Sequence, residues 1–130
     1  MKIAFKKFLP GITWFFIVLV LVFLPAEDIP SVESSFLDYI YFDKWIHFGL
    51  FAVLVLFFCW PFYNSSFNRI ERLHYFMKIA IVASLLGLVI EFIQKYFTAG
   101  RAFEILDWVA DSLGALFAFW FCRKKFLKNA

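Results

Sequence analysis

Apolar side chains occur along the chain in four long runs, separated by shorter polar segments. The runs cover about residues 8–24, 45–62, 77–97 and 105–121. Each run approaches the roughly 20 residues that a helix needs to cross about 30 Å of hydrocarbon. Because backbone groups in lipid must satisfy their own hydrogen bonds, each run is predicted to be a helix. The pattern therefore predicts an all-α, four-helix transmembrane bundle.

The connection between the first two runs is longer than a helical bundle needs. It begins at Pro25 and ends near Phe42, and it carries several aromatic side chains (Phe36, Tyr39, Tyr41 and Phe42). Aromatic residues concentrate at membrane–water interfaces, so we predict an interfacial segment in this first outward loop. The chain shows no internal repeat and no domain boundary, and residues 1–130 are predicted to form a single domain.

The composition supports a membrane protein. Apolar residues make up 64% of the chain and charged residues only 18%, against roughly 25% charged residues in ordinary globular proteins. A chain of 130 residues has too much surface for its volume to hide that apolar area from water. The net charge of +3 comes from basic residues that flank the apolar runs, which indicates a membrane surface and argues against a nucleic acid partner. Cys59 and Cys122 show no metal-binding spacing.

The distribution of basic residues predicts the orientation. Ten of the 13 lysines and arginines fall on one side of the four runs: Lys2, Lys6, Lys7, Arg69, Arg72, Lys78, Arg123, Lys124, Lys125 and Lys128. Only Lys44, Lys95 and Arg101 fall on the other side. Because cytoplasmic loops carry the excess of positive charge, both termini are predicted to be cytoplasmic.

Polar residues within the last three runs lie at helical spacings near their outward ends. Such residues are costly in a membrane, and they usually face the bundle interior or a water-filled cavity. Spacings of three and four residues place each pair on one helical face. The pairs are Asp43 with His47, Glu91 with Gln94, and Asp107 with Asp111, and Arg101 lies in the turn before the last pair. We therefore expect these side chains to converge in one outward-facing cluster.

Structural interpretations of the same residues remain open. Lys95 has the position of an interfacial anchor whose amine reaches toward the headgroups. Asp43 precedes an apolar run, as a helix N-cap does. A structural ion-pair network that includes Arg101 and Lys44 is a further alternative. Glu91 and Asp111 are the hardest to explain as structure alone, because both lie well inside their runs.

The ordered motifs resemble the VanZ-like family of small bacterial membrane proteins. They read D-K-x-x-H from Asp43 to His47, E-x-x-Q from Glu91 to Gln94, and R-x5-D from Arg101. The third motif continues through D-x3-D-x2-G to Gly114. The resemblance covers about residues 10–122. At Asp111 the family pattern usually has Asn, so a role that requires an amide is not expected at this position.

The resemblance implies a multi-pass protein of the bacterial cytoplasmic (inner) membrane that is linked to the cell envelope. The family's namesake is associated with resistance to the glycopeptide teicoplanin, which implies a role in antibiotic tolerance. The resemblance supplies neither a reaction nor a cofactor, and so it identifies the site better than it identifies the chemistry.

The leading functional hypothesis is an outward-facing pocket that binds, or also modifies, the headgroup of an anionic lipid or a lipid-linked cell-envelope precursor. Lys44 and Arg101 are the candidate phosphate ligands. Asp111 and Gln94 complete the candidate binding residues. The candidate catalytic residues form two pairs. In the first pair, His47 is the general acid–base and Asp43 orients it. The second pair is Glu91 with Asp107.

Three other hypotheses stand beside it. The five polar residues Asp43, His47, Glu91, Asp107 and Asp111 include metal-ligand types, but no zinc motif such as H-E-x-x-H occurs, and the sequence assigns no metal. A non-enzymatic membrane helper with a structural polar cluster is the principal alternative. A transporter is disfavoured by the small size of the chain and by the lack of a repeat.

Overall fold

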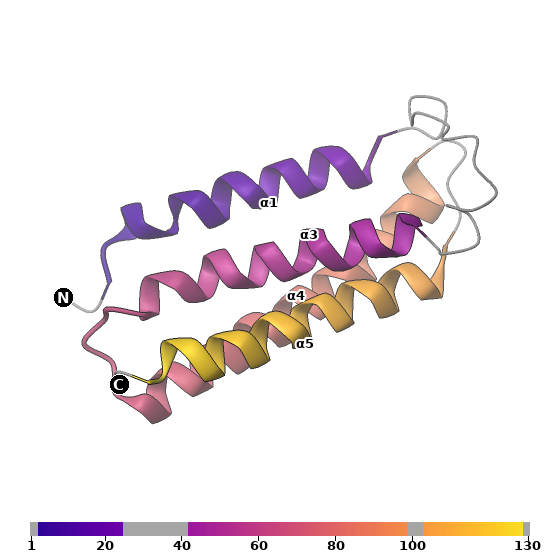
Figure 1. Cartoon of the computed structure of the whole chain (residues 1–130). Coiled ribbons are helices and arrows are strands. Elements are labelled where there is room, and N and C mark those ends of the chain that lie inside the picture. Colours follow the sequence, from indigo (N-terminus) through magenta and orange to yellow (C-terminus); the bar gives the residue numbers. More distant parts are fainter. Residues whose placement is uncertain (1–2, 25–41, 99–102, 129–130) are drawn as a thin grey trace.

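The computed structural model describes residues 3–24, 42–98 and 103–128. Within these residues, four helices are long and apolar enough to cross a membrane (Figure 1). They are α1 (Leu9–Val22, preceded by the 3₁₀ turn Phe5–Phe8), α3 (Phe42–Cys59, followed by the 3₁₀ turn Trp60–Phe62), α4 (Arg69–Phe97) and α5 (Ile105–Phe126). The predicted all-α architecture with four spans is confirmed. The predicted interfacial segment lies outside the described residues, except for Phe42, which begins α3.

Three of the helices extend beyond the apolar runs. Helix α4 begins at Arg69, well before the expected start near residue 77, because Asn68 and Glu71 form a capping box. Each of these side chains accepts a hydrogen bond from the backbone N–H of the other residue, at 3.0 and 2.9 Å, which satisfies two donors at the helix start. Helix α5 continues to Phe126 with three basic residues in its last turn, where positive charge complements the helix dipole. Helix α3 begins three residues earlier than expected.

The helices lie side by side, with α1 at one edge of the bundle (Figure 1). Helix α3 packs most extensively against α5, α4 also packs against α5, and α1 packs against α3. The start of α1 and the end of α5 lie at the same end of the bundle, called here the terminal end. The opposite end, where α3 and α5 begin and α4 finishes, is called the site end.

Helix α1 is attached to the bundle by hydrogen bonds at two depths. The indole N–H of Trp14 donates to the carbonyl oxygen of Leu50 in α3 at 3.0 Å. The amide of Gln94 in α4 donates to the carbonyl oxygen of Val22, near the end of α1. Side-chain donors that reach backbone carbonyls across helices are a common source of cohesion in membranes. These bonds fix α1 against both α3 and α4.

Arg72 organises the terminal end of the bundle. Its side chain is buried, and its guanidinium donates four hydrogen bonds to backbone carbonyl oxygens. The acceptors are Phe67 at 2.9 Å, Tyr63 and Ser65 at 2.8 Å, and Phe126 at 3.2 Å. From the sequence, Arg72 is expected only to be one of the ten basic residues on one side of the four runs. In the structure it joins the α3–α4 connection to the last turn of α5.

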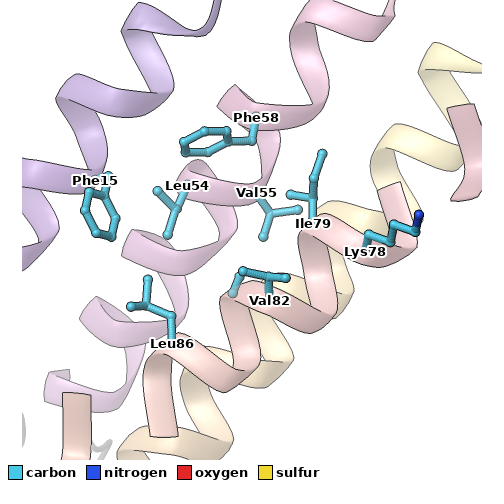
Figure 2. A pocket seen from close by; sticks show the side chains of 9 residues that line it. Phe15, Leu54, Val55, Phe58, Lys78, Ile79, Val82 and Leu86 are labelled. Atoms are coloured by element: carbon cyan, nitrogen blue, oxygen red, sulfur yellow. The ribbon is translucent and has the colours of Figure 1, made fainter. Parts of the chain in front are cut away.

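An apolar groove of about 510 Å³ runs between α1, α3 and α4. Figure 2 shows Phe15 from α1 facing side chains of α3 and α4 across it. Among the described residues that line it, Lys78 is the only charged one. The other lining residues are aliphatic or aromatic: Phe15, Leu54, Val55, Phe58, Ile79, Val82, Ala83 and Leu86. The groove is therefore an apolar surface suited to a hydrocarbon chain.

Candidate functional site

A cluster of ionisable side chains lies at the site end. Three helices contribute to it, together with the residue that precedes α5. Its members are Asp43, Lys44 and His47 from α3, Glu91 from α4, Glu104 before α5, and Asp107 and Asp111 from α5. Within the described residues, two groups of three have potential ligand atoms within 4.8 Å of one another. These are called here the rim trio (Asp43, Glu104 and Asp107) and the inner trio (His47, Glu91 and Asp111).

The rim trio encloses the ammonium group of Lys44. Lys44 Nζ lies 2.6 Å from Asp43 Oδ2 and 2.6 Å from Asp107 Oδ1, and it also donates to Glu104 Oε2. Asp43 and Glu104 are about half-exposed or more, whereas the side chain of Asp107 is buried. Asp107 lies in the first turn of α5, where the helix dipole also favours negative charge. Lys44 thus joins the start of α3 to the start of α5.

The inner trio is buried between α3, α4 and α5. The imidazole of His47 lies between two aspartates of α5, with Nδ1 at 2.9 Å from Asp111 Oδ1 and Nε2 at 3.6 Å from Asp107 Oδ2. Glu91 Oε2 accepts a hydrogen bond from the backbone N–H of Glu104 at 3.0 Å. These contacts position one imidazole and two carboxylates around a common centre.

Two carboxylate oxygens of the inner trio are buried without a partner. Glu91 and Asp111 are both 0% exposed. Glu91 Oε1 and Asp111 Oδ2 accept no hydrogen bond from the described residues. Burying a polar atom without a hydrogen bond costs at least about 1 kcal/mol, and buried charges are normally paired or bound to metals. The two oxygens therefore mark the inner trio as a place for a positively charged or hydrogen-donating group.

Glycine makes the close helix approach at the inner trio possible. A Cβ atom at Gly87 of α4 would lie 2.8 Å from Asp111 Oδ2, so only glycine leaves that carboxylate its position. One turn below, Ser84 and Ser112 place their hydroxyl oxygens 2.7 Å apart, and the indole N–H of Trp108 donates to the carbonyl oxygen of Ser84 at 2.9 Å. These two hydrogen bonds join α4 to α5 next to the inner trio, on the side nearer the terminal end.

Six of the eight candidate site residues lie in this cluster: Asp43, Lys44, His47, Glu91, Asp107 and Asp111. Some of them have different partners from those expected. Asp43 was expected to orient His47, but it pairs with Lys44, and the contact at 2.9 Å to the ring comes from Asp111. Asp43 Oδ2 lies 2.6 Å from Lys44 Nζ, and the ring is instead contacted by an aspartate that faces it from α5.

Two further candidates, Gln94 and Lys44, form contacts with other parts of the bundle. The amide of Gln94 donates to α1, and the amine of Lys44 is engaged by three carboxylates. Arg101 lies outside the described residues. Glu104 was not among the candidates, although its position one turn before Asp107 was a signal, and it contacts both Lys44 and Glu91.

The family profile described as VanZ/LLP1 matches residues 5–128. The chain is therefore a member of the VanZ/LLP1 family. The match covers nearly the whole chain, and all the motifs of the polar cluster fall within it. No curated protein and no solved structure matches the chain significantly.

The described part of this VanZ/LLP1 site is strongly acidic. Five carboxylates are accompanied by one lysine and one histidine. Because the lysine is already shared among the three carboxylates of the rim trio, the field of the inner trio favours cations and hydrogen-bond donors. Asp111, which occupies the position where the resemblance leads us to expect Asn, increases this negative character.

Proposed function

We propose that this VanZ/LLP1 protein binds the headgroup of an anionic lipid or a lipid-linked cell-envelope precursor at the site end of the bundle. The observation that supports this most is the concentration of ionisable groups from three membrane helices at one end of otherwise apolar spans. Ionisable residues within membrane helices are expensive and usually functional. A substrate held at that depth reaches the site by lateral diffusion in the membrane.

The residue types suggest which part of a headgroup each residue would bind. Carboxylates of the inner trio would accept hydrogen bonds from sugar hydroxyls or amines. Lys44 is already engaged by three carboxylates. The proposed phosphate ligand is therefore Arg101, which lies outside the described residues and is chosen because a guanidinium suits bidentate binding. If the headgroup is modified as well as bound, His47 is the group for proton transfer, because Asp111 orients its Nδ1 at 2.9 Å and Asp107 lies near its Nε2 at 3.6 Å.

The apolar groove supports a lipid ligand. Its lining continues along α4 to Leu86, which lies five residues before Glu91, or about 7.5 Å along a helix. A hydrocarbon chain that lies in the groove with its headgroup beyond Leu86 would place that headgroup toward the site end. The groove would accommodate the hydrocarbon chain of a lipid, and the polar cluster would bind its headgroup.

The alternative of a purely structural cluster is favoured by one observation, the three-carboxylate contact of Lys44. That contact uses every member of the rim trio and holds two helix starts together. The same argument does not extend to the inner trio, where two carboxylate oxygens are unpartnered within the described residues. We therefore assign a structural role to the rim trio and the binding role to the inner trio.

His47→Asn is expected to weaken headgroup binding roughly 10- to 100-fold, because hydrogen bonds to charged groups contribute about 1.5–3 kcal/mol. His74→Asn is the matched control, since His74 is exposed on α4 near the terminal end. Lipid that co-purifies with each variant in small membrane discs is quantified by mass spectrometry. Equal lipid profiles for the two variants and the wild type would contradict the assignment of the site.

We also propose that the terminal end faces the cytoplasm of a bacterial inner membrane, because most basic residues lie at that end. A membrane-impermeant maleimide added to intact spheroplasts is expected to label Phe97→Cys, at the site end, and not Lys124→Cys. The parent chain serves as the background control, since Cys59 and Cys122 are buried thiols. Labelling of Lys124→Cys and not of Phe97→Cys would show that the terminal end faces outward, which would contradict the proposed orientation.

A further inference from the structure

The two trios differ in how their negative charge is compensated. In the rim trio, the ammonium group of Lys44 lies within hydrogen-bond distance of all three carboxylates. The inner trio is deeper, and within the described residues no lysine or arginine contacts it, while two of its oxygens lack any hydrogen-bond donor. From this contrast we propose that His47, Glu91 and Asp111 bind a divalent metal ion. This site goes beyond lipid binding and does not depend on it, because all three ligands come from the chain itself.

The spacing of the trio suits a metal. The ligand atoms of His47, Glu91 and Asp111 lie within 4.8 Å of one another. Ligands about 2.1 Å from a shared tetrahedral ion lie roughly 3.4 Å apart. Rotation of the two carboxylates can reduce that difference, because each is held at only one oxygen by the described residues.

Within the described residues, the hydrogen bonds around the trio leave one oxygen of each carboxylate free. His47 Nδ1 lies 2.9 Å from Asp111 Oδ1, and a metal ion would replace the proton between these two atoms. Glu91 Oε2 is fixed by the backbone N–H of Glu104, which leaves Oε1 for the metal. Asp111 Oδ2 is likewise unpartnered within the described residues. When His47 Nδ1 points toward the ion, Nε2 faces Asp107 Oδ2 at 3.6 Å. A histidine that binds a metal commonly directs its other ring nitrogen to a carboxylate in this way.

The ligand set selects the class of ion. One imidazole and two carboxylates fit Zn²⁺ or Mn²⁺, whereas Ca²⁺ and Mg²⁺ prefer oxygen ligands alone. Three protein ligands leave one coordination position for water or for an oxygen of a bound ligand. The burial of Glu91 and Asp111 strengthens the attraction, because charges in a low-dielectric environment are poorly screened.

The test measures metal content in the full-length chain without an affinity tag, because a histidine tag would bind metal itself. Protein in detergent is treated with chelator, dialysed against Zn²⁺ or Mn²⁺ alone, and analysed by elemental mass spectrometry and by its thermal unfolding temperature. We expect about one ion per wild-type chain and a higher unfolding temperature with the ion. Ca²⁺ at the same concentration is expected to give neither effect.

The matched pair His47→Asn and His74→Asn separates the site from adventitious binding. We expect His47→Asn to lose at least tenfold in metal affinity and His74→Asn to retain the wild-type value. Asp107→Asn, which leaves the trio complete, is expected to weaken binding by a smaller factor. If His47→Asn does not fold, Glu91→Gln serves as the second ligand variant, with Glu71→Gln at the terminal end as its control.

Three results would overturn the proposal. The first is the absence of stoichiometric Zn²⁺ or Mn²⁺ from folded wild-type protein. The second is equal metal content in wild type and both ligand variants. The third is metal binding only after Arg101→Gln, which would mean that the native trio is neutralised by the chain itself. None of these results depends on lipid, because the metal is measured on protein in detergent with no lipid added, so lipid binding can fail or persist independently.

Discussion

Arg72→Gln is expected to lower the free energy of unfolding by about 3 kcal/mol or more. The guanidinium donates four hydrogen bonds to carbonyl oxygens from the α3–α4 connection and from Phe126 at the end of α5. Charged hydrogen bonds contribute about 1.5–3 kcal/mol each, and buried carbonyls that lose their donor add a desolvation cost. The sum is limited by water, which can reach some of these carbonyls once the side chain is gone.

Arg72→Lys is expected to recover little of the lost stability. A lysine ammonium is a compact charge and cannot reproduce the planar set of donors that reaches carbonyls in several directions. Arg69→Gln is the matched control, because Arg69 is exposed in the first turn of the same helix, and we expect a change within about 0.5 kcal/mol. Unfolding by a denaturing detergent, titrated into mild-detergent micelles, measures all three. A loss for Arg69→Gln as large as that for Arg72→Gln would remove the special role of Arg72.

The sequence predicted the spans because their apolar character is a direct requirement of the bilayer. It did not predict the first two turns of α4, because a capping box of Asn68 and Glu71 extends a helix without apolar residues. It also did not predict the four-carbonyl contact of Arg72. Such a contact depends on where three separate segments end in space, and no local spacing encodes that arrangement.

In the candidate site too, the sequence predicted which residues share a helix face but did not predict the contacts between helices. Spacings of four residues placed Asp107 and Asp111 on one face of α5, and the structure has both beside His47. The partner of each residue could not be predicted from one helix alone. Asp43 shares a face with His47 on α3 but pairs with Lys44, since the facing helix supplies a closer carboxylate to the ring. Contacts between helices depend on rotation and depth, which the sequence does not specify.

Gly114→Ala is expected to destabilise the bundle by about 1–3 kcal/mol, the usual cost of overpacking a close contact. A Cβ atom at this position of α5 would overlap the carbonyl oxygen of Phe48 and lie 3.1 Å from the backbone nitrogen of Ala52, both in α3. Backbone atoms cannot rotate aside as a flexible side chain does, so the two helices must separate. Interfaces of this type in membranes depend on small residues for close approach.

Gly49→Ala provides the matched control. Gly49 lies on α3, the helix that Gly114 of α5 contacts, and a Cβ atom at Gly49 would meet no atom within 4 Å. Alanine is favoured over glycine in a helix by about 1 kcal/mol, so we expect Gly49→Ala to be neutral or slightly stabilising. Gly114 lies three residues after Asp111 on α5, and Phe48 follows His47 on α3. Separation of these helices would therefore move the imidazole away from Asp111 and weaken metal and headgroup binding together with stability. Wild-type stability and binding in Gly114→Ala would show that α3 and α5 are not held as closely as this contact requires.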